Sequence, residues 1–320
     1  MDKIKLGIIG VGNMGKNHVR LAREHEAYID FAGVFDPDKE RVKKMELEDI
    51  AYDSEQELME AVDAVIVAAP SSMHKKLGLM AAENGCHLLV EKPLALSYED
   101  GKDLVEAFER TGKVLMVGHV ERFNPVVTEL EKVIKNEKIV AIETDRCSPM
   151  DRRISDTDVI YDLMIHDVDI LINSIVPNAE IDHLHAVGTT SYSEHFKDYV
   201  QAVFRFDNGA VGSVVSSRAT EGKIRSIRVH CDKACIEADL LHKSMEISRK
   251  TRYSLDVGYD PTYKQENIKE EIFVPNVESL KTEQLHFFEC IRDNKMSKTS
   301  GVSALRSLKV LDAIKSEVYQ

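Results

Sequence analysis

The chain has 320 residues and a formal net charge of −13, with 43% hydrophobic and 30% charged residues. This composition is typical of a globular protein with room for two domains, and it excludes a disordered chain. An acidic surface repels phosphate backbones and no apolar run reaches the ~18 residues of a membrane span, so we expect neither a nucleic-acid nor a membrane partner.

The first part of the chain alternates strands and helices. Five short apolar runs predict buried strands, at residues 3–9, 30–36, 63–69, 86–91 and 114–119. Helical patterns lie between most of them, from 13 to about 26, at 73–84 and at 97–112. Nearly continuous apolar strands that alternate with helices predict a parallel sheet covered on both faces. We therefore expect an α/β domain over residues 1–120.

The pattern changes after residue 120. A helix is predicted at 124–136, a strand near 139–146, a helix at about 157–175, strands at 198–206, 207–215, 224–231, 234–239 and 244–249, and helices at 278–293 and 302–317. The i, i+2 spacing of Phe204 and Phe206 places both side chains on one face of a strand, and Asn208-Gly209 is typical of a hairpin turn. These features predict a substrate-binding and oligomerisation α+β domain over 121–320, built on a mostly antiparallel open sheet.

A glycine motif follows the first strand and opens the first helix. Gly10, Gly12 and Gly15 form the sequence GVGNMG, with Asn13 and Met14 between the last two glycines. The first glycine allows a tight turn, the second a close approach to a pyrophosphate, and the third close packing of helix on strand. The N–H groups of the helix end would hold the phosphates. We therefore predict a dinucleotide-binding Rossmann domain; a glycine-rich turn without a ligand is the alternative.

The end of the second strand indicates which dinucleotide binds. Asp36 lies 21 residues after Gly15, where a carboxylate accepts hydrogen bonds from ribose hydroxyls and repels a 2′-phosphate. Pro37 and Asp38 follow in place of an arginine, so we expect NAD rather than NADP, although Arg41 is close. Asp36 can also be a helix N-cap.

The cysteines and the start of the chain indicate the cellular compartment in which we expect the protein. Five cysteines, an odd number without a C-x-x-C pair, indicate free thiols in a reducing cytoplasm. The spacing of Cys231 and Cys235 does not fit a zinc site, so we expect no metal. The chain passes from its first methionine straight into a strand-like run without a signal-peptide pattern.

Two further segments carry candidate chemistry. In DLMIHDVD (162–169), Asp162, His166 and Asp169 are spaced i, i+4, i+7 and share one helix face amid apolar residues. Lys92, in VEKPL, follows a predicted buried strand at the sheet edge where ligands bind in open α/β folds. A salt-bridged surface helix and a solvated lysine are the alternatives.

Together, GVGNMG, EKP and D-x-x-x-H-x-x-D resemble the Gfo/Idh/MocA family, named for glucose–fructose oxidoreductase and inositol dehydrogenase, over nearly the whole chain. The resemblance implies an NAD-dependent oxidoreductase that oxidises a sugar or cyclitol hydroxyl and forms a homodimer or homotetramer through its C-terminal sheet. It also implies the catalytic group Lys92, Asp162 and His166, with a cis peptide between Lys92 and Pro93.

The same resemblance extends the cofactor site. AAPSSMH resembles the family's cofactor loop, which implies cofactor contacts by Pro70, Ser72 and His74, and by Glu91 and Lys92 of the EKP segment. His74 can equally be a helix-start residue without a chemical role.

One departure from the family pattern concerns the substrate. Residues 157–160 read TDVI where the family often has a Gly-Gly pair, which favours a subgroup with a different substrate wall. GHVERFNP (118–125) and the segment 146–169 resemble the UDP-N-acetylglucosamine 3-dehydrogenases. Substrate contacts are then expected from Arg122, Asn124, Arg146, Arg153, Asp162 and His166. Arginines, including the neighbouring Arg152, suit a diphosphate, whereas a surface salt bridge is the alternative for each.

The expected mechanism assigns a role to each group. His166 is the general base, Asp162 orients it, Lys92 donates to the reacting oxygen, and Asp169 serves local structure. The best candidate for the reacting group is the 3-hydroxyl of UDP-N-acetylglucosamine. Alternatives are an inositol or free-sugar dehydrogenase, a redox-neutral glycosidase that uses NAD transiently, and a non-catalytic NAD-binding regulator.

Overall fold

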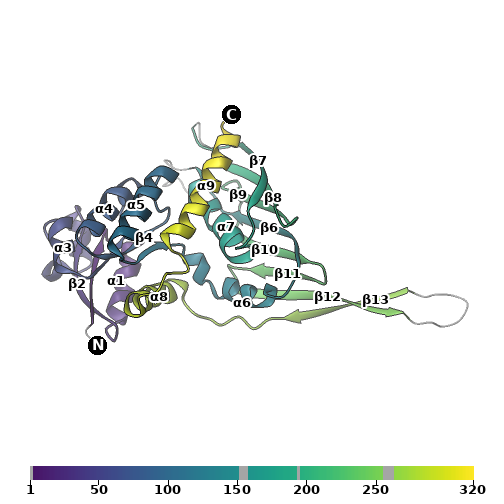
Figure 1. Cartoon of the computed structure of the whole chain (residues 1–320), viewed down its shortest axis with the longest axis horizontal. Coiled ribbons are helices and arrows are strands. Elements are labelled where there is room, and N and C mark those ends of the chain that lie inside the picture. Colours follow the sequence, from purple (N-terminus) through teal and green to yellow (C-terminus); the bar gives the residue numbers. More distant parts are fainter. Residues whose placement is uncertain (1–2, 151–157, 193–194, 255–262) are drawn as a thin grey trace, which may run out of the picture. The chain divides into compact units, whose positions relative to one another are not determined.

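The computed structural model describes residues 3–150, 158–192, 195–254 and 263–320 (Figure 1). The chain divides into two compact units: Met1–Phe123 with Glu278–Asp312, and Asn124–Val277 with Ala313–Gln320. The expected boundary at residue 120 is close to the observed one. The expectation that everything beyond it forms the second domain was wrong, because residues 278–312 belong to unit 1.

Unit 1 contains a five-stranded parallel sheet in the order β2-β1-β3-β4-β5. Its strands are β1 (Ile4–Ile9), β2 (Ile29–Phe35), β3 (Ala64–Val67), β4 (His87–Glu91) and β5 (Leu115–Gly118). Its helices are α1 (Gly15–Glu24), α2 (Lys39–Lys44), α3 (Glu55–Ala61), α4 (His74–Glu83), α5 (Tyr98–Thr111), α8 (Ser279–Asp293) and the short 3₁₀ turns η1 (Glu48–Ile50), η2 (Ser71–Met73) and η3 (Val120–Phe123). The predicted parallel sheet is confirmed. Its order reverses direction between β1 and β3, which places a ligand crevice at the carboxyl ends of these strands.

Local sequence accounts for the ends of the unit 1 helices. The Ser97 hydroxyl accepts the Asp100 N–H at 3.2 Å and begins α5, while Gly112 ends it in the left-handed region at φ +66°. The helix buries Leu104 and Phe108, which its 3.6-residue period places on one face.

Unit 2 contains an eight-stranded sheet in the order β13-β12-β11-β10-β6-β9-β8-β7. Its strands are β6 (Ile139–Cys147), β7 (Ile181–Thr189), β8 (Tyr199–Phe206), β9 (Val211–Ser217), β10 (Ile224–Cys231), β11 (Ala234–Asp239), β12 (Ser244–Ser254) and β13 (Tyr263–Glu271). Neighbouring strands in the described sheet are antiparallel except β6 and β9, which confirms the expected mostly antiparallel sheet. The outermost strands, β7 and β13, were not predicted from the sequence. Edge strands are buried less regularly, so their apolar alternation is weak.

Helices of unit 2 pack against one face of this sheet. They are α6 (Pro125–Ile134) and a continuous helical segment made of η4 (Ile160–Met164), α7 (Ile165–Ile170) and η5 (Leu171–Ile175). Both η4 and η5 are π-helical turns, a form that often occurs at functional sites. The Asp158 carboxylate accepts the N–H groups of Ile160 and Tyr161 at 3.0 and 3.3 Å, which begins the segment.

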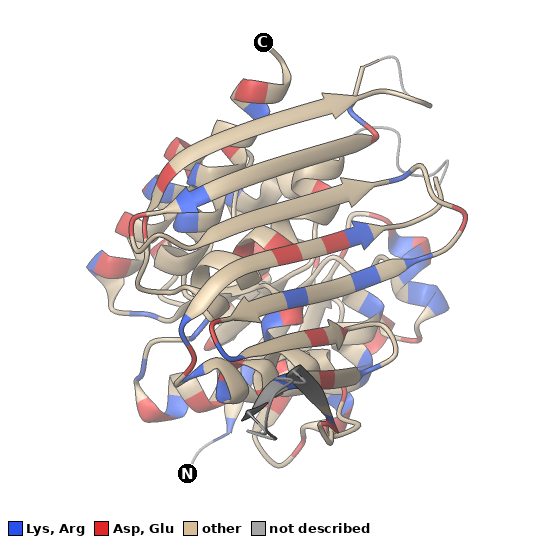
Figure 2. Ribbon diagram, turned by 90° about the vertical axis from the view of Figure 1, so that its right-hand side faces the viewer, with Lys and Arg blue, Asp and Glu red and all other residues tan. Residues whose placement is uncertain are grey.

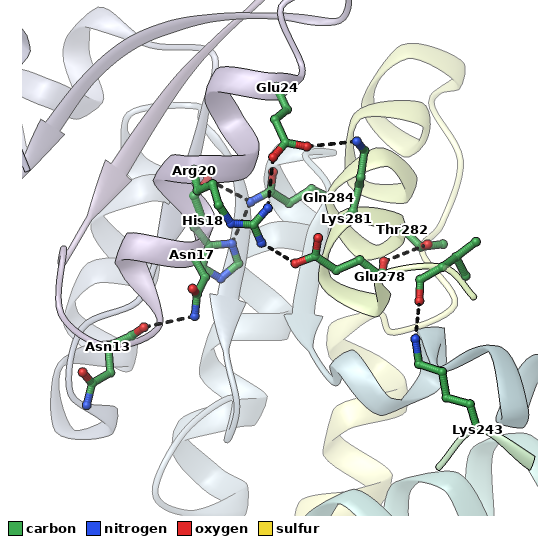
Figure 3. A network of polar contacts seen from close by, with 11 residues as sticks. Asn13, Asn17, His18, Arg20, Glu24, Lys243, Glu278, Lys281, Thr282 and Gln284 are labelled. Carbon is green, nitrogen blue, oxygen red and sulfur yellow. Dashed lines mark hydrogen bonds and ion pairs between the residues drawn. The ribbon is translucent and has the colours of Figure 1, made fainter. Parts of the chain in front are cut away.

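The last helix, α9 (Gly301–Val318), follows α8. α8 packs on α1 within unit 1 through a charged network: Arg20 pairs with Glu24 and Glu278, and Lys281 donates to Glu24 at 2.9 Å (Figure 3).

All five cysteines, which lie in the described ranges, are free, as expected. Within those ranges, no helix has the length and apolarity needed to cross a membrane.

Candidate active site

The glycine motif forms the turn between β1 and α1. Gly10 has φ +86°, and a Cβ on it would lie 2.7 Å from the Ala68 carbonyl oxygen; a Cβ on Gly15 would lie 1.8 Å from the Gly10 carbonyl oxygen. Side chains are therefore excluded at both positions. A Cβ on Gly12 would meet only the Arg41 guanidinium, at 3.6 Å, so the backbone here is open to a ligand. This geometry fits a dinucleotide turn.

Asp36 is fixed by backbone amides directly after β2. Its Oδ2 accepts the Val11 N–H and its Oδ1 accepts the Asp38 N–H, both at 2.8 Å, and the side chain is 2% exposed. The N-cap of α2 is Asp38, whose carboxylate accepts the Glu40 N–H at 3.1 Å, so the N-cap interpretation of Asp36 was wrong. Arg41 lies 3.8 Å from the Asp36 carboxylate and 3.2 Å from that of Asp38.

A pocket of about 450 Å³ opens at this edge of the unit 1 sheet. Of the predicted cofactor residues, its lining includes Gly10, Gly12, Met14, Asp36, Pro70, Glu91 and Lys92. Asn13 lies in an adjoining pocket with Lys16 and Arg41. The tertiary structure therefore collects residues from the ends of four strands around one space, as expected for a dinucleotide site.

The EKP segment leaves β4 beside this pocket. The peptide between Lys92 and Pro93 is cis, as the family resemblance implied. The Glu91 carboxylate is bonded to His18 Nε2 at 2.8 Å. Burial alone would raise the pKa of Glu91, but the bond to His18 and the charge of Lys92 lower it below its usual value. Glu91 is thus a partly buried carboxylate next to the candidate catalytic amine.

His74 has a structural position. It is the first residue of α4, its side chain is buried, and its Nδ1 and Nε2 lie 2.7 Å from the Pro93 carbonyl oxygen and 3.0 Å from that of Ala69. Burial lowers the pKa of His74. Among the residues that the structure describes, the pocket lining includes neither His74 nor Ser72. The alternative that the sequence left open, a helix-start histidine, fits this geometry better than a cofactor contact.

In unit 2, Asp162 and His166 lie one helical turn apart, on η4 and α7. Asp162 accepts a hydrogen bond from Arg218 Nη2 at 2.9 Å, and its side chain is 24% exposed whereas that of Arg218 is 3% exposed. Arg218 follows directly after β9 and was missed in the sequence analysis, because no local pattern pairs it with a residue 56 positions away. A buried arginine therefore holds the candidate catalytic carboxylate.

The other two aspartates of this segment are buried and have structural partners. Asp167 forms a bidentate pair with Arg146, whose Nε and Nη2 each donate at 3.0 Å. Asp169 accepts from the Asn173 amide, one turn later, at 2.8 Å, which fits its expected role in local structure. The pairing of Arg146 favours the salt-bridge alternative over contact with a diphosphate.

The remaining predicted substrate residues differ in position. Arg122 is buried in η3 of unit 1. Asn124 caps α6, since its Oδ1 accepts the Val126 N–H at 3.1 Å and its Nδ2 donates to the Leu240 carbonyl at 3.3 Å, which gives it a structural role. Arg152 and Arg153 lie outside the described residues.

Comparison with known proteins agrees with this geometry. A family model described as an oxidoreductase family with an NAD-binding Rossmann fold matches residues 4–119, and the Gfo/Idh/MocA C-terminal domain model matches residues 141–237. UDP-N-acetylglucosamine 3-dehydrogenase of Acidithiobacillus ferrooxidans is 31% identical over 77% of each chain, and a solved structure of it covers 99% of this chain and 98% of its own, with a TM-score of 0.87 and 27% identity. The scyllo-inositol 2-dehydrogenase (NAD(+)) of Bacillus subtilis is 27% identical over 96% of this chain and 92% of its own.

A parallel sheet with a glycine turn after its first strand, a fixed acid after its second and a lysine after its fourth defines a dinucleotide-dependent oxidoreductase. The chain belongs to the Gfo/Idh/MocA family and is an NAD-dependent enzyme of that class. The open backbone at Gly12 and the carboxylate of Asp36 fit the pyrophosphate and ribose of NAD.

Proposed function

We propose that this protein oxidises a secondary hydroxyl of a sugar or nucleotide sugar with NAD as the hydride acceptor, and that the best candidate is the 3-hydroxyl of UDP-N-acetylglucosamine. The observation that carries the proposal is the pocket of unit 1, where Lys92 lies in the same lining as the glycine turn and Asp36. The relative named for that substrate is 31% identical over 77% of this chain.

Each residue has a distinct task in this proposal. Bound NAD supplies an electrophilic nicotinamide carbon for the hydride. His166 accepts the hydroxyl proton, a task that suits imidazole because its ordinary pKa lies near neutral pH. Lys92 donates to the reacting oxygen and stabilises its developing negative charge. Asp162, held by Arg218, orients the imidazole and stabilises its protonated form.

In this proposal, the proton acceptor and the hydrogen-bond donor come from different units of the chain. Lys92 belongs to unit 1 and His166 to unit 2. Both groups act on the oxygen of the reacting hydroxyl, so each side chain has to come within hydrogen-bonding reach of that oxygen.

An inositol is the second candidate substrate. It is favoured by the relatives named as inositol dehydrogenases, one of which is 27% identical over 96% of this chain. A cyclitol carries no diphosphate and needs no arginine cluster, and the pairing of Arg146 with Asp167 removes one arginine from the expected cluster. The two substrates are therefore separable by experiment.

The test is a panel of UDP-sugars, free sugars and inositols, with NADH absorbance as the signal and product analysis alongside. NADH formation with UDP-N-acetylglucosamine alone supports the best candidate, and formation with inositols alone contradicts it. A cleaved glycoside without net NADH identifies the redox-neutral alternative, and NAD binding without turnover on any substrate identifies a regulator.

The His166→Ala variant tests the general base. We expect kcat to fall by roughly 10²- to 10⁴-fold, the usual contribution of such a base, with little change in NAD affinity. His242→Ala is the matched control, because this histidine is exposed in the turn between β11 and β12. Equal turnover in the two variants would exclude His166 from the role.

We also propose that the protein is cytoplasmic and assembles as a homodimer or homotetramer through the unit 2 sheet. Five free thiols suit a reducing compartment. The sheet face opposite α6 and α7 carries exposed valines on β7, β8 and β9, whereas charged residues concentrate on the strands beyond β9 (Figure 2). A second copy would cover these valines.

A further inference from the structure

Two buried histidines hold the segment that carries the candidate catalytic lysine. His18 of α1 and His74 of α4 are 0% and 1% exposed, and each contacts a residue next to Lys92. His18 bonds the Glu91 side chain, and His74 bonds the Pro93 carbonyl oxygen. Neither histidine belongs to the pocket lining formed by the described residues.

The hydrogen bonds around His18 determine its tautomer. Gln284 of α8 places its Nε2 2.9 Å from His18 Nδ1 and 3.2 Å from the His18 carbonyl oxygen (Figure 3). A carbonyl oxygen only accepts, so this Gln284 atom is the amide nitrogen and donates. His18 Nδ1 is then an acceptor, and the proton lies on Nε2, which donates to Glu91 at 2.8 Å. Gln284 thus orients the ring toward Glu91.

The contacts of His74 identify its donor as well. Both ring nitrogens face carbonyl oxygens, at 2.7 Å for Pro93 and 3.0 Å for Ala69. Because burial lowers the pKa of His74, the ring is neutral near pH 7 and has one N–H to donate. The shorter contact assigns that proton to Nδ1 and the hydrogen bond to Pro93. The ring therefore holds the backbone on the other side of Lys92.

We propose that His18 and His74 are positioning residues that hold the Glu91–Lys92–Pro93 segment and so place the Lys92 amine for its part in the reaction. This inference rests on the proposed function of Lys92. A lysine side chain is long and flexible, so its amine is placed accurately only when its backbone is fixed on both sides. A displacement of about 1 Å can lower a rate by roughly 10²-fold.

The two histidines donate their hydrogen bonds through different ring nitrogens. At each position, one of the two amide substitutions, Asn or Gln, therefore keeps the bond and the other loses it. An asparagine amide nitrogen lies approximately where Nδ1 lies, and a glutamine amide nitrogen lies approximately where Nε2 lies. At His74, therefore, Asn keeps the bond to Pro93 and Gln loses it. At His18, Gln keeps the bond to Glu91 and Asn loses it.

We expect His74→Gln and His18→Asn to lower kcat by roughly 10- to 100-fold with little change in KM or in NAD affinity. We expect His74→Asn and His18→Gln to keep kcat within roughly 3-fold of wild type, well inside the loss that a 1 Å displacement causes. The order of Asn and Gln is thus opposite at the two positions. General damage to folding would not reverse that order, so the same order at both positions overturns the proposal.

A second measurement does not need a substrate. In the NAD complex, NMR of ¹³C-methylated lysines, with the Lys92 signal assigned from Lys92→Arg, reports how well Lys92 is ordered. We expect one sharp Lys92 signal in wild type and in the two bond-keeping variants, and a broadened signal near the solvent-exposed value in the other two. A Lys92 signal that is the same in all four variants overturns the inference.

Imidazole ¹⁵N shifts of the wild-type protein test the assignment when a variant does not fold. We expect the proton on Nε2 of His18 and on Nδ1 of His74, and the opposite tautomer at either position contradicts the proposal. If wild type oxidises no substrate of the panel, the proposed function fails, while the ¹³C and ¹⁵N measurements still decide whether the histidines position Lys92.

Discussion

At the scale of single residues, the segment DLMIHDVD shows that helical spacing and burial point to different residues as candidates for the reaction. The spacing i, i+4, i+7 groups Asp162, His166 and Asp169 on one face. Burial separates them, because Asp169 is 1% exposed and bonded to Asn173, whereas the Asp162 side chain is 24% exposed and held by Arg218. A carboxylate that is both accessible and fixed suits a partner of a general base, so Asp162 is the acid of this segment that we assign to the reaction.

Asp36 provides the first prediction at this scale. Asp36→Ala should weaken NAD binding by roughly 10- to 100-fold, the range for hydrogen bonds to a charged group, and should reduce the preference for NAD over NADP. Asp36→Asn removes the charge but keeps an acceptor for a backbone amide, so it should relax the preference with less loss of stability. Dissociation constants for both cofactors, from fluorescence titration, measure the effect.

Asp30→Asn is the control for this prediction. Asp30 is an exposed aspartate on the same strand, β2, and is not among the described residues that line the pocket, so its substitution should not change cofactor preference. If the ratio of NAD to NADP affinity is the same in wild type and in both Asp36 variants, another residue recognises the ribose.

At the scale of elements, α8 completes the Rossmann unit from the far end of the chain. It brings Gln284 to His18 and also buries Glu283, which is 0% exposed. Neither carboxyl oxygen of Glu283 has a hydrogen-bond partner among the residues that the structure describes. Burial and then the negative charge of Glu91 raise the pKa of Glu283 well above its usual value, while Lys298 opposes the shift. Burial therefore favours the protonated form of Glu283 in the folded protein.

This shift predicts how stability changes with pH. Above the ordinary pKa, near 4.5, the unfolded chain releases the Glu283 proton while the folded chain keeps it, so wild type loses stability as pH rises toward the folded pKa. Glu283→Gln has no proton to release. The difference in free energy of unfolding, variant minus wild type, should therefore increase from pH 4.5 to pH 7.5.

Denaturant unfolding at several pH values measures this difference. Glu57→Gln is the control, because Glu57 is an exposed glutamate in α3. A difference for Glu283→Gln that decreases as pH rises would mean that Glu283 is ionised in the folded protein.

At the scale of the whole molecule, the residues that we assign to the proposed reaction come from both units of the chain. The dinucleotide pocket and Lys92 are in unit 1, whereas His166, Asp162 and Arg218 are in unit 2. Residues 278–312 belong to unit 1, so the unit that carries Lys92 is built from two separate parts of the chain. We propose the exposed face of the unit 2 sheet as the assembly surface.

The exposed sheet face gives the last prediction. Val203, on β8, is 45% exposed on this face, and Val203→Glu should shift the protein from dimers or tetramers to monomers, because a second copy would bury the added charge. Val302→Glu is the control, since this valine is 49% exposed on α9, outside the sheet. Sedimentation velocity measures the result, and an unchanged oligomer in both variants would exclude this face.

The sequence by itself determined the parallel sheet and the glycine turn of the Rossmann unit, because the strands are buried on both faces and the turn of residues 10–15 is a local requirement of the backbone. It also identified the helix that carries His166 and the hairpin at Asn208-Gly209, where Gly209 has φ +84°.

Only the tertiary structure decided the hydrogen-bond partners of the side chains: Arg218 for Asp162, Arg146 for Asp167, Gln284 for His18, and Pro93 for His74. These contacts join residues 19 to 266 positions apart, and a side chain's role there depends on what burial places against it. A local pattern carries no information about such a neighbour, which is why the supporting residues of the site were found only in the fold.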